Sequence, residues 1–407
     1  MYISHIKLSK IRCFDDFEIN LEDGDQHVKW TTVLGNNATG KSTLFRSIAI
    51  GLCDESSAAG LLKESEHGYI RHDEQEAIIE IVLKDGNLKN ECCIKTTIKK
   101  VETEGGKTSF EQLRQEVKGK LPWNDLFVCI YGTGRGVSGT GDVTGYSVIN
   151  AVYNIFNYSE GLQNPELALR RMGEDKQTEF FDALKNILDL NPFGDIILTK
   201  TGLKVDGRWG NDMPLRDLAD GYKSTFYWIT DLFGWAVSFD PTIKNLKDVK
   251  GIVMIDELEQ HLHPSWQRFI IKRLRKELKN VQFIVSTHSP LIVLGTADLD
   301  NAMISSLKLD GNSAKNEEEK ADVYKGMRVD QVLTSSAFDL PIARSGETGD
   351  MVLRFQKLIL KEELSEIEIS EFDNLKKKIK KLPDVYETME NLRIHKEIRD
   401  LIKKNDK

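Results

Sequence analysis

The stretch GNNATGKST, residues 35–43, decides the fold of this chain. It matches the pattern G-x-x-x-x-G-K-[ST], which binds nucleotide phosphates when a strand precedes it and a helix follows it. The apolar run WTTVLG (30–35) and the helix-like run GKSTLFRSIAIGL (40–52) provide that setting. A chance glycine turn is the alternative, and the flanking strand and helix argue against it.

We expect the backbone of this loop to curl around phosphate oxygens, with Lys41 reaching the β and γ phosphates of ATP and the Ser42 hydroxyl ligating Mg²⁺. The predicted nucleotide-binding residues are Gly35, Asn36, Asn37, Ala38, Thr39, Gly40, Lys41, Ser42 and Thr43.

Two acids follow a second buried run, GIVMIDE (251–257). A strand that buries its body and ends on acids is typical of the Walker B element, where Asp256 binds the metal and Glu257 acts as general base. A third run, FIVSTHSP (283–290), ends near His288. We expect His288 to help position the attacking water, although a structural loop histidine is the alternative.

LADGYKST (218–225) is a second candidate anion-binding segment. Gly221 comes just before an aromatic-rich helical run, so backbone N–H groups at that helix start are available to an anion. The segment contributes Leu218, Ala219, Asp220 and Gly221 to the predicted site.

The length of 407 residues indicates two or three subdomains. No apolar run reaches the roughly 18 residues that span a bilayer, and we expect no membrane association. The N-terminus lacks a signal-peptide pattern. The five cysteines are odd in number and irregularly spaced, which predicts reduced thiols in a cytoplasmic protein and no disulfide or zinc site.

The formal net charge of −8 does not suggest a general polyanion binder. The run LKKKIKKL (375–382) is locally basic, and we interpret it as a solvated helix face, with a phosphate-contacting surface as the alternative.

The rest of the chain alternates between strand and helix patterns. We expect a hairpin over 2–21 and strands at 76–84, 90–102, 123–132 and 195–207, with a DGN turn at 85–87. We expect helices at 148–156, 165–172, 177–190, 264–278 and 351–364. A glycine-rich loop is predicted at 132–145, and a polar linker at 309–322.

The order of these motifs resembles the ABC-type ATPases, in particular their SMC/RecF-like branch. The residues that carry the resemblance are 35–43, 218–221, 252–257 and His288, and the opening hairpin is also similar. The resemblance implies an α/β fold: an ABC-type P-loop ATPase head with a mixed sheet and an antiparallel β lobe. The head would span 1–307, with a helical subdomain inserted at about 146–192, and a helical extension for partner or oligomer contacts would span 308–407.

The same resemblance implies a homodimer. In such proteins two heads meet head to tail, and the signature helix of one faces the γ-phosphate that the other's lysine holds. It also implies that Arg12 lies near the nucleotide. Ala219 departs from the serine that is usual at the second signature position, and we expect weaker closure or slow hydrolysis as a result.

DELEQHLHPSWQ (256–267), YGTGR (131–135), NYSEGLQNPELALRRM (157–172) and RVDQVLTSSAFDLPIARSGET (328–348) resemble stand-alone ATPases of the OLD and PtuA kinds, closest to the ATPase subunit of Septu-type anti-phage systems. We read His261 and His263 as structural residues, with a metal pair as the alternative. We find no Toprim nuclease pattern, so the resemblance implies a separate HNH-type nuclease subunit. A RecF-like repair or chromosome-maintenance ATPase that contacts DNA is the alternative function, and a transporter ATPase fits less well.

Overall fold

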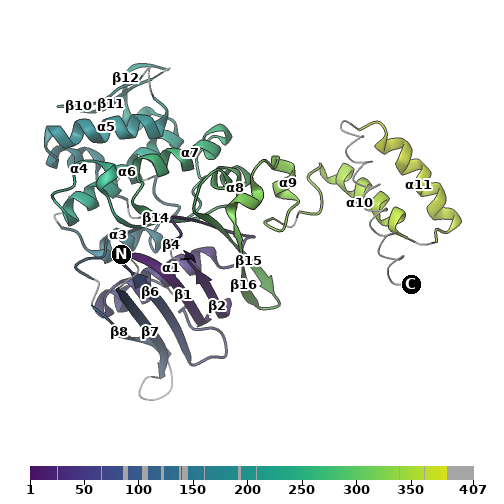
Figure 1. Ribbon diagram of the computed structural model, residues 1–407, viewed down its shortest axis with the longest axis horizontal. Coiled ribbons are helices and arrows are strands. Elements are labelled where there is room, and N and C mark those ends of the chain that lie inside the picture. The colour runs from purple at the N-terminus through teal and green to yellow at the C-terminus, as the bar shows by residue number, and fades with distance from the viewer. Residues whose placement is uncertain are drawn as a thin grey trace. The chain divides into compact units, whose positions relative to one another are not determined.

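The computed structural model describes residues 1–382 except 25, 66, 86–89, 103–108, 121–122, 137–138, 140–144, 160, 191–193, 208, 339 and 362. It forms two compact units, Met1–Val329 and a second that begins at Asp330. Figure 1 labels most of the helices and many of the strands of both units.

The centre of the first unit is a six-stranded sheet in the order β16-β15-β5-β14-β13-β9. Its strands are β5 (Trp30–Gly35), β9 (Val128–Tyr131), β13 (Gly251–Ile255), β14 (Val281–Ser286), β15 (Ala302–Asp310) and β16 (Ser313–Lys320). All pairs are parallel except β15–β16. Every residue of β9, β13 and β14 is buried, as expected for parallel strands covered on both faces.

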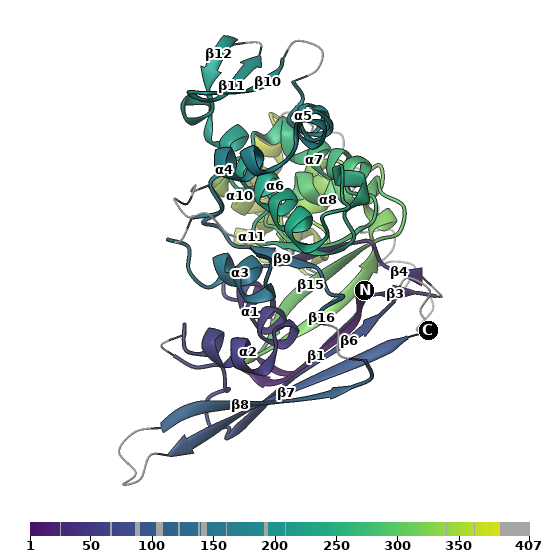
Figure 2. The same ribbon diagram turned by 90° about the vertical axis from the view of Figure 1, so that its left-hand side faces the viewer.

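A five-stranded antiparallel sheet, in the order β2-β1-β6-β7-β8, forms a separate lobe. Its strands are β1 (Tyr2–Ile11), β2 (Phe14–Asn20), β6 (Glu76–Lys84), β7 (Glu91–Glu102) and β8 (Ser109–Lys118). Alternate residues of β6 are buried, so one face covers a core and the other faces solvent. Helices α1 (Lys41–Leu52) and α2 (Glu55–Leu62) pack on the covered face (Figure 2). A short β3–β4 pair (Glu22–Asp23, Gln26–His27) follows β2.

The central sheet separates two hydrophobic cores. Ile252 and Met254 of β13 belong to the core shared with α1 and the antiparallel lobe. Val253 and Ile255 point to the opposite core, which the later helices cover. Those helices are α4 (Pro165–Arg171), α5 (Glu174–Leu188), α6 (Asp220–Phe239), α7 (Pro264–Glu277) and α8 (Pro290–Ala297). Helix α3 (Val148–Val152) contributes to both cores, with Val152 in the first and Ala151 in the second. The mixed sheet and the antiparallel lobe agree with the predicted fold class.

A small antiparallel sheet follows α5: β10 (Ile196–Thr199), β11 (Gly202–Gly207) and β12 (Gly210–Pro214). Short 3₁₀ turns lie at Tyr153–Ile155, Leu215–Asp217, Leu246–Asp248 and Ala321–Tyr324.

One prediction about local structure was wrong, and one predicted strand is shorter than expected. The expected polar linker at 309–322 is largely a hairpin, in which β16 pairs antiparallel with β15 along eight residue pairs. Its charged residues suit a strand at the edge of the sheet. The expected strand at 123–132 is shorter, because only Val128–Tyr131 joins the sheet. The DGN turn and part of the glycine-rich loop lie outside the described residues.

The second unit contains α10 (Gly346–Leu360) and α11 (Glu366–Ile379), and α9 (Val329–Leu333) begins at its boundary. Val352 and Phe355 pack with Ile379 in a small core of their own. Arg354 binds Glu371 through two hydrogen bonds of 2.9 and 2.8 Å. The apolar residues of α10 therefore pack, at least in part, against α11.

In the part of the chain that the structure describes, no helix has both the length and the apolar character needed to cross a bilayer. All five cysteines are free thiols.

Candidate functional site

The loop between β5 and α1 has the shape of a phosphate cradle. Gly35 and Gly40 have φ angles of 155° and 99°, which residues with a Cβ rarely adopt. A Cβ at Gly40 would collide with Cys13 and Phe14, and one at Gly35 would collide with Thr39 and Leu307. Both glycines are therefore needed for the backbone to curl here. Asn36, Asn37 and Ala38 are exposed at the tip.

Lys41 is the first residue of α1, and its side chain folds back into the loop. Its ammonium donates to the carbonyls of Gly35 at 2.7 Å and Asn36 at 3.1 Å. Lys41 is only 7% exposed, and burial lowers the pKa of its ammonium, while Asp256 and other nearby acids oppose that shift. A buried cation that donates to neutral carbonyls gains by exchanging them for phosphate oxygens.

The structure brings the loop and the end of β13 together through Ser42 and Asp256. The Ser42 hydroxyl donates to Asp256 Oδ2 at 2.7 Å. Ser286, at the end of β14, donates to the other oxygen of Asp256. A hydroxyl and a carboxylate oxygen at this separation are the hard ligands that Mg²⁺ takes, so the residues fit this metal.

Glu257 lies two residues after the end of β13, in the left-handed region, with φ of 50°. Its N–H donates to the Ser286 hydroxyl at 2.8 Å, and its carbonyl accepts from Arg135 at 2.5 Å. Its side chain is half-exposed, whereas Asp256 is 2% exposed. The neighbouring acids thus meet different surroundings, since one is enclosed by hydroxyls and the other is open to water.

His288 lies two residues after β14 and is half-buried. Its backbone N–H donates to Glu259 Oε1 at 2.5 Å, and Thr287 donates to Glu259 Oε2 at 2.6 Å. Glu259 therefore ties the turn after β13 to the turn after β14. This holds the backbone of His288 close to that of Glu257.

Arg12 lies in the turn between β1 and β2 with φ of 45°. Its Nε donates to the carbonyl of Gly68 at 2.9 Å, another guanidinium N–H donates to Ser65, and the group stacks 4.4 Å from the Tyr69 ring centroid. The neighbouring Cys13 thiol contacts the carbonyl of Thr39 at 3.7 Å. The hairpin turn thus adjoins the phosphate loop, while the Arg12 side chain is engaged by the segment before β6.

The signature segment begins α6. Leu218 is buried, whereas Ala219 and Asp220 are exposed. Ala219 is the N-cap residue and provides no side-chain hydrogen bond to the helix. A Cβ at Gly221 would lie 2.5 Å from the carbonyl of His261 in the same chain. This glycine is therefore required for packing within its own chain, a role that the sequence pattern did not reveal.

His261 and His263 have structural surroundings. His263 caps α7, accepting from the N–H of Ser265 at 3.3 Å, and its ring lies 2.8 Å from the Ser265 hydroxyl. His261 is exposed, and its carbonyl faces Gly221. Among the described residues there is no group of three or more His, Cys, Asp or Glu side chains suited to hold a metal ion.

Three residues of the site were missed by sequence reasoning: Arg135, Glu259 and Ser286. YGTGR and FIVSTHSP contain two of them, but neither pattern assigns them a partner. Their positions depend on β9, β13 and β14 being neighbours in the sheet. The strand order is a feature of the tertiary structure, so the sequence patterns themselves do not indicate which partners these three residues have.

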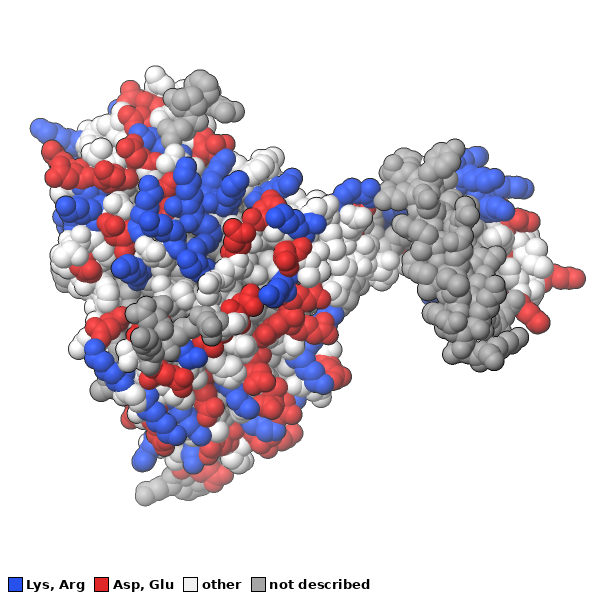
Figure 3. Space-filling model, in the orientation of Figure 1, with Lys and Arg blue, Asp and Glu red and all other residues white. Residues whose placement is uncertain are grey.

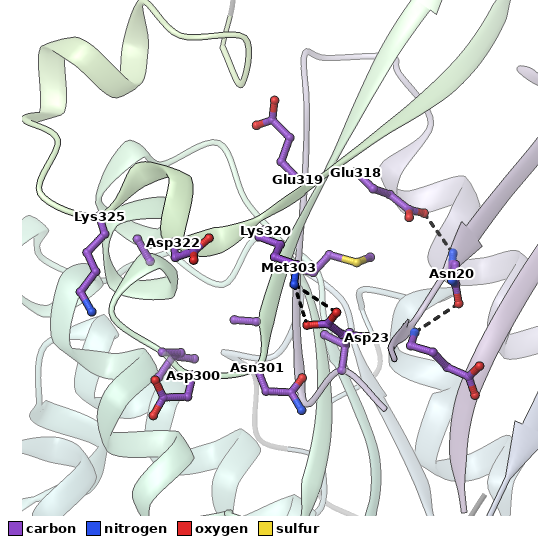
Figure 4. Close-up of a pocket in the computed structure, with 15 residues that line it drawn as sticks. Asn20, Asp23, Asp300, Asn301, Met303, Glu318, Glu319, Lys320, Asp322 and Lys325 are labelled. Atoms are coloured by element: carbon purple, nitrogen blue, oxygen red, sulfur yellow. Dashed lines mark hydrogen bonds and ion pairs between the residues drawn. The ribbon is translucent and has the colours of Figure 1, made fainter. Parts of the chain in front are cut away.

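A separate hollow of about 440 Å³ lies between the β16 end, the turn before β15 and β3 (Figure 4). Its lining is rich in acids, and several polar groups there already pair. Lys320 binds both oxygens of Asp23 at 3.1 Å, and Glu318 accepts from the N–H of Asn20 at 3.0 Å. None of the predicted site residues lines it.

Two family models match the chain. One, described as an AAA domain, putative AbiEii toxin, Type IV TA system, covers residues 153–294, and another AAA domain covers residues 5–127. The chain is 24% identical to the Septu protein PtuA of Bacillus mycoides (strain KBAB4) over 409 aligned positions, which is 98% of this chain and 53% of the relative. It is 38% identical over 120 residues to the Retron Ec83 probable ATPase of Escherichia coli, covering 29% of this chain and 20% of that one.

The chain thus spans about half or less of the length of these relatives. Among solved structures, the SMC head domain from Thermotoga maritima superposes with a TM-score of 0.47 and 15% identity, covering 78% of this chain and 98% of that one. Two segments of the chain thus match models of AAA ATPase domains, and the chain is similar in sequence to the Septu protein PtuA and to the retron ATPases.

Proposed function

We propose that this chain hydrolyses ATP between two head-to-tail copies, as the ATPase subunit of a bacterial anti-phage defence complex with a separate HNH-type nuclease. The observation that carries the ATPase part is the 2.7 Å hydrogen bond between Ser42 and Asp256. It joins the phosphate loop to the acidic end of β13, with Glu257 next in the chain. The relatives named Septu PtuA and retron ATPase support the defence role.

The proposed roles follow from the surroundings of each residue. Lys41 exchanges the carbonyls of Gly35 and Asn36 for β and γ phosphate oxygens. Ser42 and Asp256 hold Mg²⁺, which neutralises charge on the phosphates when bound. Glu257 has a half-exposed carboxylate and accepts a proton from the attacking water. His288 lies on the neighbouring turn and orients that water.

The signature helix acts in trans in this proposal. Ala219 and Asp220 are exposed at the start of α6, where the helix dipole and N–H groups favour an anion. The anion is the γ-phosphate bound by the partner copy. Free thiols in all five cysteines support a cytoplasmic location.

Mixing two inactive variants tests the shared site. Lys41→Ala removes the charge that binds phosphate, and Ala219→Asp places a carboxylate at the start of α6 without disturbing the Gly221 contact. Each variant alone should lose nearly all ATPase activity. In a mixed dimer one site carries both changes and the other carries neither, so activity should partly return. If Ala219→Asp hydrolyses ATP at the wild-type rate, the role of the signature helix in trans is wrong. Independently, if Glu257→Gln hydrolyses ATP at the wild-type rate, the assignment of Glu257 as the base is wrong.

DNA binding by a RecF-like ATPase is the second candidate, and a basic surface favours it. Figure 3 shows Lys and Arg side chains gathered on the face around α7. The exposed lysines of this region are Lys244, Lys247, Lys250, Lys272, Lys276 and Lys279. Binding of duplex DNA that weakens steeply with salt, and that is lost in Lys272→Glu/Lys276→Glu, would favour this function. Protection from phage that needs both Lys41 and a neighbouring nuclease gene would favour the first.

A further inference from the structure

Arg135 is a buried cation bound only by backbone oxygens among the described residues. It is 1% exposed and comes from the segment that follows β9. One terminal nitrogen donates to the carbonyls of Gly132 at 3.1 Å and Asp256 at 2.7 Å. The other donates to the carbonyl of Glu257 at 2.5 Å. One guanidinium therefore joins the two successive carbonyls of the acidic pair.

The guanidinium remains charged at neutral pH. Burial lowers the pKa of Arg135 to about 10, and the nearby acids Glu259, Asp256 and Glu257 oppose the shift. A charge is costly to bury unless hydrogen bonds and opposite charges compensate it. Here the carbonyl dipoles and the three acids provide that compensation, so the cation is held against the back of the Walker B turn.

The carbonyls that Arg135 holds belong to a strained turn. Glu257 has φ of 50°, a conformation that a residue with a side chain keeps only when its surroundings impose it. Its N–H is held by the Ser286 hydroxyl at 2.8 Å, and its carbonyl by Arg135. The N–H and the carbonyl of Glu257 are thus both bound by side chains from other elements. Of these two side chains, Arg135 is the charged one.

We propose that Arg135 is a positioning residue, which holds the backbone of Glu257 so that its carboxylate faces the attacking water. The proposal rests on the assignment of Glu257 as the base. Arg135 touches no reacting atom in this scheme and acts only through the turn. The segment from Gly132 to Arg135 is itself anchored, since Asn154 Oδ1 accepts from the N–H of Gly132 at 2.9 Å.

Arg275 offers a matched control. It is also partly buried and donates to backbone carbonyls, those of Leu278 at 3.3 Å, Val281 at 2.8 Å and Lys279 at 3.1 Å. Burial lowers its pKa as well. It comes from the last turn of α7, and its guanidinium binds the turn before β14, at the opposite end of the strands from the phosphate loop. Arg275→Lys therefore measures how the loss of a carbonyl-binding guanidinium changes the stability of the protein when the site itself is untouched.

The test compares Arg135→Lys with Arg275→Lys in the full chain. A lysine keeps the charge but has no planar fork to bind both carbonyls of the turn. Arg135→Lys should lower kcat for ATP by about tenfold to a hundredfold, as a small misplacement of a reacting group does. The dissociation constant for ATP should stay within about threefold, because the phosphate loop is untouched. Arg275→Lys should leave both quantities unchanged.

Amide hydrogen exchange without nucleotide provides a second readout. The amides of residues 256–258 should exchange faster in Arg135→Lys than in the wild type, but not in Arg275→Lys. The two variants are compared under conditions in which each has lost the same amount of thermal stability. Arg135→Gln, which keeps one amide donor and loses the charge, should show the same pattern more strongly. If neither Arg135 variant yields folded protein, the residue is a general determinant of folding and the positioning role is overturned.

The outcomes separate this proposal from the proposed function. If Glu257→Gln is inactive but Arg135→Lys retains wild-type kcat or unchanged exchange at 256–258, the positioning role is overturned and the ATPase assignment stands. If wild-type protein does not hydrolyse ATP, or Glu257→Gln is as fast as wild type, the assignment of the base fails. The positioning role fails with it, whatever the exchange shows.

Discussion

Asp256 and Glu257 are adjacent in sequence, yet their side chains meet opposite conditions. Ser42 and Ser286 enclose the Asp256 carboxylate, while that of Glu257 is half-exposed beyond a left-handed turn. A metal ligand benefits from such fixed partners, and a base needs access to water. The difference arises from one backbone turn, which the order of residues alone does not reveal.

Another buried acid, Asp231, links the fold to pH. Tyr131 donates to one of its oxygens at 2.9 Å, and the N–H of Gln163 donates to the other at 2.9 Å. Burial nevertheless raises the pKa of Asp231 from 3.8 to about 6. Between about pH 4 and pH 6 the unfolded chain loses this proton before the folded chain does. Stability therefore falls as pH rises through this window, and then levels.

Replacement of Asp231 with asparagine should remove this pH dependence. The amide keeps an acceptor for the N–H of Gln163, and its NH₂ group can donate to Tyr131. At pH 7.5 Asp231→Asn should be more stable by up to ~3 kcal/mol, and the gap should shrink toward pH 4.5. Urea unfolding at both pH values measures it. An equal gap at both would show that Asp231 does not titrate in this range.

Ala219 allows helix capping to be separated from phosphate binding. Serine and aspartate both cap helices, so Ala219→Ser and Ala219→Asp should each raise the free energy of unfolding by about 1 kcal/mol without nucleotide. Only serine can donate to a phosphate, so it should lower the ATP concentration needed for dimerisation, whereas aspartate should raise it. Thermal unfolding and light scattering measure the two effects. If both variants shift dimerisation equally, Ala219 does not face phosphate.

At the scale of elements, the strands and helices around the motifs were predictable because burial leaves a period in the sequence. β1, β2, β5, β13 and β14 lie where their patterns indicated. The β15–β16 hairpin was not predicted, because its second strand, SAKNEEEK, buries only Ala314 fully. Its position comes from pairing with β15 and from Asn316, which binds Ser305 at 2.7 Å. Such edge strands are specified by tertiary partners.

The start of α6 packs against the turn that follows Glu257, and Gly221 allows this approach. A methyl group at residue 221 would lie 2.5 Å from the His261 carbonyl. Gly221→Ala should therefore destabilise the protein by about 1–3 kcal/mol. A methyl group at Gly60, inside α2, would meet no atom of the described residues within 4 Å, so Gly60→Ala should stabilise by about 0.5–1 kcal/mol. Chemical denaturation compares them, and equal effects would contradict the close approach.

At the scale of the whole molecule, the chain divides into two compact units, Met1–Val329 and a second that begins at Asp330. The two large cores contain no residue beyond Ala314, and the small core of the second unit begins at Ile342. Every predicted site residue also lies before residue 329. Chain order and motif spacing predicted an ATPase head followed by helices. They did not predict that the hairpin up to Lys320 belongs to the head.

A chain of residues 1–329 should therefore fold and bind ATP. Its affinity should match that of the full chain within about threefold, because no residue of the two large cores and no predicted site residue is removed. Circular dichroism and calorimetric titration measure folding and affinity. We also predict that the second unit makes oligomer or partner contacts. The chain of residues 1–329 tests this, because it should no longer form such assemblies. Insoluble protein, or a large loss of affinity, would show that the head depends on residues 330–407.

The central claim is that ATP joins two copies of this head and that hydrolysis through Glu257 separates them. Light scattering of Glu257→Gln measures it directly, because this variant keeps the shape of the side chain but cannot accept the proton. With ATP and Mg²⁺ its mass should be twice that of the nucleotide-free protein, whatever the oligomeric state of the latter. With ADP its mass should stay unchanged. Lys41→Ala/Glu257→Gln should show no change with either nucleotide. A mass that stays constant in Glu257→Gln at saturating ATP would contradict the account.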